Sequence, residues 1–176
     1  MDNHKYYLIV RNPYRKLIFF YQDKFHQHPV KARGILHYHR WENSQKIFFP
    51  YLDIKLETSP EDIRTRLINV DFDYFIKLLP KVYLQDPHLW PQYYIKYLRY
   101  KSFVVGRINY DKVLKMESEK DMDFLVNELR LDLSKKYRST PSYSIDSYMN
   151  SNFLKLVNII YKEDFNFFRY DSKLNN

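Results

Sequence analysis

Cysteine is absent from the 176 residues of the chain, and glycine occurs only twice, at Gly34 and Gly106. The lack of cysteine excludes disulfides, iron–sulfur clusters, thiol catalysis and cysteine-ligated zinc. A dinucleotide-binding fingerprint and a Walker-type phosphate loop each need several closely spaced glycines, so both are excluded as well. No apolar run approaches the ~20 residues of a membrane-spanning helix, and Met1–Lys5 leads into no signal peptide. We therefore expect a cytoplasmic protein that makes no contact with a membrane.

Basic residues are in excess, and the excess is concentrated near the start of the chain. The formal net charge is +8. Residues 1–50 hold nine Lys and Arg against three Asp and Glu, whereas the remainder is almost balanced at 20 against 18. This asymmetry predicts an anionic partner such as a phosphate, a nucleotide, a sulfated sugar or a nucleic acid. The alternative is a solvated basic surface that serves solubility.

The pattern of the sequence predicts one domain over residues 1–176, because no repeat, low-complexity tract or Gly/Ser linker interrupts it. The apolar run 6–10 predicts a buried strand, and Pro13 then begins a helix that continues to Phe25. Further elements are expected as helices from Ser59 onward, over 71–79 ending at Pro80, over 122–133 and over 152–161, and as strands at 103–105 and 113–116. Residues 26–58 and 135–143 are expected to be mostly loop. Strands alternating with a majority of helices indicate an α/β fold with a small parallel sheet.

The first strand, turn and helix carry three basic side chains: Arg11, Arg15 and Lys16. A helix N-terminus offers free backbone N–H groups and a partial positive charge, and an adjacent arginine can hold a phosphate dianion. This turn is therefore a candidate phosphate site.

The segment that contains the turn, residues 10–25 with the sequence VRNPYRKLIFFYQDKF, also resembles a known family. It is similar to the 3′-phosphate-binding segment of sulfotransferases that use 3′-phosphoadenosine 5′-phosphosulfate. The closest likeness is to the carbohydrate sulfotransferases, whose segment reads approximately VRDPYERLVSAYRDKF. Four further blocks resemble the family in the same order: the helix 72–79; Asp86, His88, Trp90, Pro91 and Gln92; residues 110–117 (YDKVLKME); and Tyr161, Asp164, Phe165, Phe168 and Tyr170.

The resemblance implies a P-loop-NTPase-like sulfotransferase fold, truncated at its N-terminus, with a small parallel sheet and predominant helices. It implies that Arg11 would contact the 3′-phosphate of the cofactor, with Lys16 adding charge and the helix lending its N-terminus. The basic loop with Lys136 and Arg138 would close over the adenine nucleotide, unless it is a solvated surface. The implied reaction transfers a sulfuryl group from 3′-phosphoadenosine 5′-phosphosulfate to a carbohydrate hydroxyl and needs no metal.

The chain also departs from the family pattern. Phe19 stands where the family has a phosphate-binding serine, Asn12 replaces an aspartate, and Lys16 replaces an arginine. The family's Pro-Lys-x-Gly-x-Thr loop, which binds the 5′-phosphosulfate, has no counterpart here. The chain would then be part of a longer or split enzyme, with a partner chain or second copy covering an incomplete sheet, or a relative that no longer catalyses. The alternative functions are a non-catalytic protein that binds a nucleotide or an anionic glycan, and a basic nucleic-acid-binding protein.

A sulfotransferase needs a base that takes the proton of the acceptor hydroxyl. His88 is the candidate catalytic residue, because an imidazole titrates near neutral pH. The alternative is a structural histidine that holds its loop together, and Glu117 is a second candidate base.

Four histidines form two His-x-His pairs: His26, His28, His37 and His39. On a strand, each pair would place both imidazoles on one face, as metal ligands require. Because neither an acid nor a cysteine lies close to them in sequence, we expect no metal site and interpret the region as a basic loop.

Overall fold

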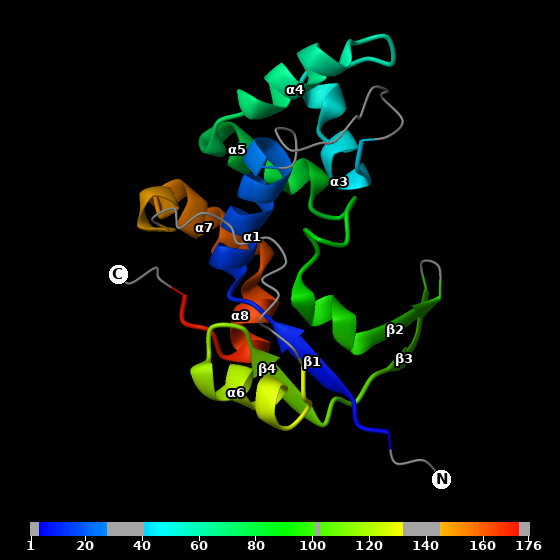
Figure 1. Ribbon diagram of the computed structural model, residues 1–176, viewed down its shortest axis with the longest axis vertical. Coiled ribbons are helices and arrows are strands. Elements are labelled where there is room, and N and C mark those ends of the chain that lie inside the picture. Colours follow the sequence, from blue (N-terminus) through cyan, green and yellow to red (C-terminus); the bar gives the residue numbers. More distant parts are fainter. Residues whose placement is uncertain (1–3, 28–40, 101–102, 132–144, 173–176) are drawn as a thin grey trace. The chain divides into compact units, whose positions relative to one another are not determined.

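The computed structural model describes residues 4–27, 41–100, 103–131 and 145–172 (Figure 1). These residues form two compact units, each assembled from separate stretches of the chain. Unit 1 comprises Met1–Lys16, Pro91–Ser139 and Val157–Asn176, and unit 2 comprises Leu17–Trp90 and Thr140–Leu156. The expectation of one domain stays a prediction.

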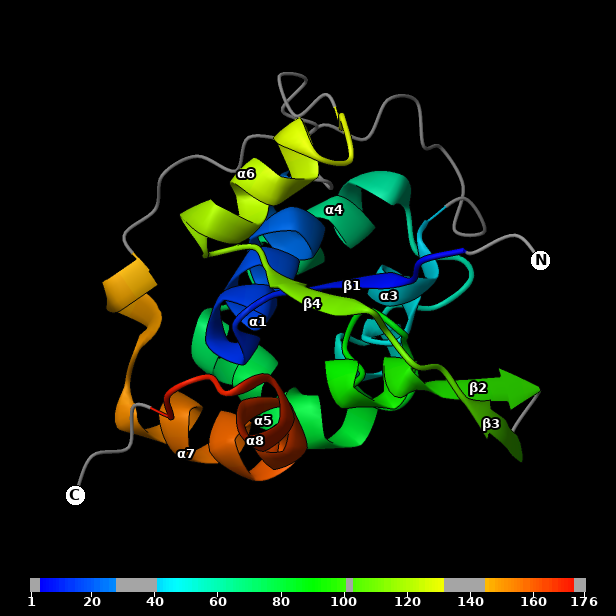
Figure 2. The same cartoon turned by 90° about the horizontal axis from the view of Figure 1, so that it is seen from below.

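The centre of unit 1 is a two-stranded parallel sheet, which confirms the expected α/β class with a small parallel sheet. Strand β1 (Tyr7–Val10) pairs with β4 (Lys112–Lys115), and the two strands run side by side in Figures 1 and 2. Leu8 and Val10 are buried and pack with Phe168, whereas Ile9 is 44% exposed. The alternation of a strand therefore buries one face of β1, so the expected strand is present and its burial is confined to that face.

A second pair of strands in unit 1 is antiparallel. The 3₁₀-helix η4 (Gln92–Lys96) leads directly into β2 (Tyr97–Tyr100), which pairs with β3 (Phe103–Arg107). The strand expected at 103–105 is confirmed as part of β3. Strand β2 was not predicted, because no breaker separates it from the preceding helix.

Helix α6 (Glu119–Asn127) of unit 1 and the helices near the end of the chain, of which α7 (Ser151–Ile160) extends from unit 2 into unit 1, differ from what the sequence predicts. Helix α6 begins earlier than residue 122, because the side chain of Ser118 accepts the N–H of Asp121 at 3.2 Å and caps it. The helix expected over 152–161 is α7, but it is not the last one. Helix α8 (Lys162–Phe168) follows it and ends at Arg169, whose φ of 53° is left-handed.

Helix α1 (Pro13–Tyr21) begins in unit 1, ends in unit 2 and continues into the π-helix η1 (Gln22–Gln27). In unit 2, α4 (Pro60–Ile68) is capped by Ser59, as the sequence predicts. Helix α5 (Phe72–Val82) passes through Pro80, so the expected end there was wrong. The missing N–H of Pro80 falls in the last turn, and the helix extends just far enough to bury Val82.

Aromatic rings fill the core of unit 2. Part of the region 26–58 that was expected to be mostly loop forms two short helices, α3 (Asn43–Lys46) and η3 (Phe49–Tyr51); a further 3₁₀-helix, η5 (Ile145–Tyr148), lies later in the chain. Phe75 lies within 5.4–6.0 Å of five other ring centroids, those of Phe20, Tyr21, Phe25, Phe48 and Phe72. Burial of these rings supplies much of the hydrophobic stabilisation of the unit.

Candidate functional site

The turn between β1 and α1 is built by Asn12 and Pro13. Asn12 Oδ1 accepts the backbone N–H of Tyr14 at 3.0 Å and that of Arg15 at 3.4 Å. Asparagine is a preferred N-cap, and proline suits the first helical position because it has no N–H to satisfy. Asn12 therefore caps the helix, although the resembling family has aspartate at this position.

The backbone of Arg11 is held by the side chain of Gln92. The N–H of Arg11 donates to Gln92 Oε1 at 2.9 Å, and Gln92 Nε2 donates to the carbonyl of Arg11 at 2.6 Å. Gln92 is itself fixed, because the fully buried Asp164 accepts the N–H of Gln92 at 2.8 Å and that of Tyr93 at 2.7 Å. Three blocks far apart in sequence therefore hold the end of β1 in one geometry.

The other side of the turn is held by Glu117, which follows β4. Its Oε1 accepts the N–H of Asn12 at 2.9 Å, and its Oε2 accepts the hydroxyl of Tyr170 at 3.0 Å. Because both carboxylate oxygens bond to the protein, this geometry favours a positioning role for Glu117 over its candidate role as a base.

The charge of the turn comes from two arginines. Arg15 is exposed and Arg11 is partly buried. Burial lowers the pKa of the Arg11 guanidinium, and the negative charge of Glu117 acts in the opposite direction. Arginine remains protonated in proteins, so Arg11 and Arg15 present two positive charges at the start of α1.

Lys16 lies in the same unit as Arg11 and Arg15 and interacts with Tyr161 and Asp164. Its Nζ lies 5.3 Å from the ring centroid of Tyr161, and its charge lowers the pKa of Asp164 against the larger, opposite effect of burial. The side chain of Lys16 is therefore directed toward the start of α8.

The geometry of the turn decides what a phosphate could use there. Pro13 has no N–H, and the N–H groups of Tyr14 and Arg15 already donate to Asn12. The backbone donors expected from the helix N-terminus are therefore occupied. An anion would depend on the guanidinium groups of Arg11 and Arg15 and on the helix dipole.

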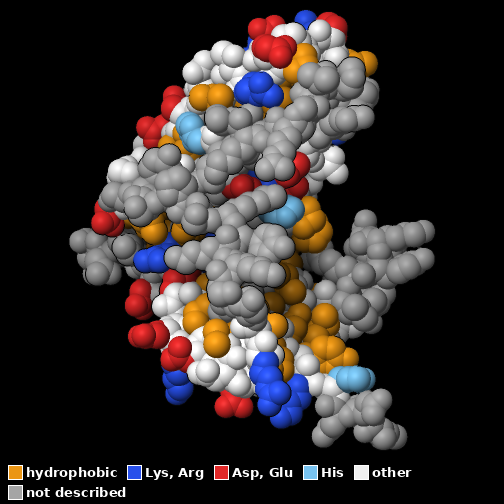
Figure 3. Space-filling model, viewed as in Figure 1, with side chains coloured by type: hydrophobic (Ala, Val, Ile, Leu, Met, Phe, Trp, Pro, Cys, Tyr) orange, Lys and Arg blue, Asp and Glu red, His pale blue; other side chains and the backbone are white. Residues whose placement is uncertain are grey.

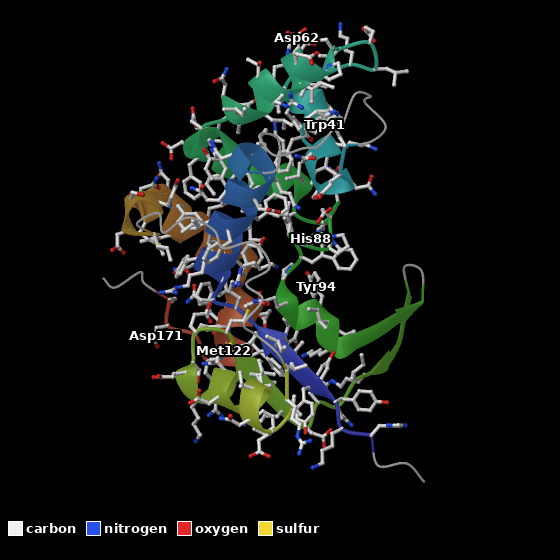
Figure 4. The ribbon with its side chains drawn as sticks, viewed as in Figure 1. Trp41, Asp62, His88, Tyr94, Met122 and Asp171 are labelled. Carbon is white, nitrogen blue, oxygen red and sulfur yellow. The ribbon has the colours of Figure 1, made fainter. Side chains whose placement is uncertain are left out.

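In unit 2, Asp86 and His88 form a hydrogen-bonded pair in the segment of the chain that follows α5 (His88 is labelled in Figure 4). Asp86 Oδ1 accepts the backbone N–H of His88 at 2.7 Å and lies 2.7 Å from Nδ1 of its ring. The side chain of Asp86 is 5% exposed, and that of His88 is 68% exposed. When Nδ1 donates to the carboxylate, Nε2 carries the lone pair and can accept a proton.

Several residues singled out in the sequence lie outside the described part of the chain: Lys136, Arg138, His28, His37 and His39. His26 is described and its ring lies 4.8 Å from that of Tyr21, where burial lowers its pKa. Among the described residues, no group of three or more potential metal ligands occurs.

The basic excess of residues 1–50 does not form a continuous field in the described part of the chain. Lys24 is buried and pairs with Asp23 at 2.7 Å and Glu42 at 2.5 Å. The face in Figure 3 carries both acidic and basic side chains. Within the described residues, no helix is both long and apolar enough to cross a membrane.

No protein-family model matches the chain, and neither a curated protein nor a solved structure matches it. A function for the chain is therefore inferred from the geometry of the β1–α1 turn and of the Asp86–His88 pair. Sequence reasoning assigned no role to Gln92 or Asp164 beyond their place in the resembling blocks. The signal for Asp164 was an acidic residue between aromatic residues, and only the fold reveals its partners.

Proposed function

We propose that the chain is a sulfotransferase-like protein whose β1–α1 turn binds the 3′-phosphate of an adenosine 3′,5′-bisphosphate moiety. The observation that carries the proposal is the fixed position of Arg11. Hydrogen bonds hold its backbone to Gln92 and hold its neighbour Asn12 to Glu117.

The four blocks that meet at the turn support this proposal. They are the β1–α1 segment, the Pro91–Gln92 block, the β4 block that ends at Glu117, and the α8 block with Asp164 and Tyr170. All of these residues belong to unit 1, and the hydrogen bonds join them through residues that the resemblance singled out. A fixed backbone at Arg11 favours phosphate binding, because less conformational entropy is lost when the side chain binds.

A catalytic version of the proposal needs a base for the acceptor hydroxyl, of a carbohydrate according to the resemblance, to which the cofactor would supply a sulfuryl group. The Asp86–His88 pair of unit 2 has the chemistry of such a base, because Asp86 holds the imidazole in one tautomer and would stabilise the imidazolium.

A binding protein without catalysis is the second candidate. Phe19 and the lack of a 5′-phosphosulfate loop favour it, because preorganised donors for the leaving phosphate supply much of the rate in such reactions. The enzyme and the binding protein both need the 3′-phosphate site, so binding is tested first.

The test is a thermal unfolding titration with adenosine 3′,5′-bisphosphate, with adenosine 5′-monophosphate as the control ligand at the same ionic strength. At 100 times Kd, binding adds about 2.7 kcal/mol, which raises the Tm by about 5–10 °C for a chain of this size. Arg11→Gln is expected to weaken binding about ten- to a hundredfold, the loss of one hydrogen bond to a charged group.

The matched control is Lys120→Gln, which removes one exposed positive charge from α6 and is expected to bind the bisphosphate normally. Equal shifts with both nucleotides, or equal affinity of Arg11→Gln and the parent chain, would overturn the proposed site. Sulfuryl transfer to sugar acceptors then separates the enzyme from the binding protein.

A further inference from the structure

A lysine ammonium group is enclosed by aromatic rings where η4 meets β2. Lys96 is only 4% exposed. Its Nζ lies 3.3 Å from the ring centroid of Tyr93, 4.7 Å from that of Phe167 and 4.9 Å from that of Tyr97. Among the described residues, no carboxylate forms an ion pair with it. The ring faces stabilise the charge, and an oxygen acceptor nearby would stabilise it further.

The hydroxyl of Tyr97 shares a hydrogen bond of 3.2 Å with the hydroxyl of Tyr93. The ammonium of Lys96 lies 4.9 Å from the centroid of the Tyr97 ring. Arg107 lies directly opposite Tyr97 in the β2–β3 register. A second hydroxyl and two cationic residues are thus neighbours of the Tyr97 side chain.

This environment favours the phenolate form of Tyr97. The hydrogen bond with Tyr93 is the largest cause of a lowered pKa at this hydroxyl, and the nearby cations Lys96 and Arg107 lower the pKa further. The side chain of Tyr97 is partly exposed to solvent, so a reagent can reach the oxygen.

Two other tyrosines of unit 1 have the opposite hydrogen-bond polarity. The hydroxyl of Tyr110 donates to the carbonyl of Ile95 at 3.1 Å, and that of Tyr170 donates to the carboxylate of Glu117 at 3.0 Å. Burial raises the pKa of both hydroxyls. They keep their protons and provide an internal comparison for Tyr97.

We propose that Tyr97 is a nucleophilic phenol and a covalent modification site for sulfur(VI) electrophiles of the sulfonyl and sulfuryl class. In the reaction, the phenol releases its proton to solvent and the phenolate oxygen forms a bond to sulfur. The bond between sulfur and the leaving group breaks, and the leaving group departs with the electron pair. Neither atom is oxidised or reduced. The exposed Arg107 also stabilises the negatively polarised oxygens of the incoming group. This site does not depend on the Arg11 turn.

The experiment treats the full chain with a limiting amount of 4-(fluorosulfonyl)benzoate and measures the rate of adduct formation at each tyrosine by peptide mass spectrometry. Tyr97 is expected to be labelled ahead of Tyr110 and Tyr170. Tyr97→Phe is expected to lose this adduct. Arg107→Gln is expected to slow labelling of Tyr97 about fivefold, the effect of one cation at contact distance in water.

Lys96→Met removes the second cation and is expected to slow labelling of Tyr97 as well. If this buried substitution disturbs folding, Arg107→Gln at an exposed position still tests the effect of a cation on the labelling rate. Lys120→Gln, remote in sequence and equal in charge change, is expected to leave the rate unaltered. Labelling of Tyr97 no faster than that of Tyr110, or an unchanged rate in Arg107→Gln, would overturn the proposal. Arg107→Gln and Tyr97→Phe leave the residues of the Arg11 turn unchanged. Bisphosphate binding by these variants is therefore measured separately, so that failure of one proposal can be distinguished from failure of the other.

Discussion

Gln92 and Arg11 are separated by 81 residues in sequence, yet the side-chain amide of one pairs with both backbone polar groups of the other. The amide therefore bonds to Arg11 as a neighbouring strand would, at the point where β1 ends. Arg11 therefore follows the strand with a fixed backbone, which favours a site that depends on the guanidinium groups of Arg11 and Arg15.

Replacing Gln92 tests this relationship. Gln92→Ala leaves the N–H and carbonyl of Arg11 partly buried without their partner, so we expect a loss of about 1–3 kcal/mol in the free energy of unfolding. Urea denaturation measures the loss. The control is Gln85→Ala, whose amide bonds to Lys81 at an exposed position and whose removal is expected to cost less than about 0.5 kcal/mol. Equal losses in the two variants would contradict the role given to Gln92.

Asp164 is expected to impose a pH dependence on stability. Burial raises the pKa of this carboxyl above its ordinary 3.8, against the opposing effect of the two N–H donors. The folded state therefore holds the proton more tightly than the unfolded state does. The resulting stabilisation is complete below pH 3.8 and is lost as pH rises through the raised pKa.

The measurement compares the parent chain with Asp164→Asn by denaturation at a series of pH values. The stability of the parent relative to this variant is expected to fall as pH rises through that window. A relative stability that increases with pH would contradict the raised pKa. At neutral pH, Asp164→Ala is expected to lower the free energy of unfolding by about 2–4 kcal/mol, because two buried N–H groups lose their acceptor. The control Asp123→Ala, at an exposed site of α6, is expected to leave the free energy of unfolding unchanged.

The ring of His88 is expected to carry its proton on Nδ1. Asp86 accepts from this nitrogen, whereas an unconstrained histidine side chain populates both tautomers, with the proton mainly on Nε2. Nitrogen-15 NMR of the ring, recorded about two pH units above the ordinary histidine pKa of 6.5, reports the tautomer directly. Asp86→Ala is expected to abolish the preference, and the exposed His4 serves as the internal reference. If His88 shows the same spectrum as His4, Asp86 does not orient it.

Lys24 is expected to contribute to the stability of unit 2. Burial alone would lower its pKa, but hydrogen bonds to Asp23 and Glu42 outweigh burial and raise it above the ordinary 10.5. This stabilisation is complete below pH 10.5 and is lost as pH rises through the raised pKa. Lys24→Met is expected to cost about 1–3 kcal/mol at neutral pH, less than a fully buried pair because both acids are partly exposed.

The control for Lys24→Met is Lys55→Met, which removes an exposed lysine of the same unit. Chemical denaturation at neutral pH and at pH above the raised pKa measures both variants. If the two substitutions have the same cost at neutral pH, the ion pairs of Lys24 contribute nothing to folding.

Where the sequence predicted elements well, the decisive interactions are local. Asn12 and Ser59 each cap a helix by bonding to an N–H two or three residues ahead, and such spacing is visible in the sequence. The end of α5 was wrong, because burial of Val82 outweighs the helix-breaking effect of Pro80. Strand β2 was missed because its identity depends on pairing with β3.

The candidate site divides in the same way. Residue types and spacing predicted a basic strand–turn–helix with Arg11, and the family resemblance singled out His88. They could not predict that Asp86 orients His88, that Glu117 and Gln92 hold the turn, or that Arg107 lies opposite Tyr97.

The sequence by itself determined the excluded chemistries, the start of α1 at Pro13 and the presence of Arg11 at the end of a strand. Only the tertiary structure decided which distant groups form hydrogen bonds with the backbone of that turn. It also brought Asp164 within hydrogen-bond distance of the N–H of Gln92 and placed Arg107 opposite Tyr97. The physical reason is that a buried polar group must find a partner, and only the folded chain brings residues from opposite ends of the sequence within hydrogen-bond distance.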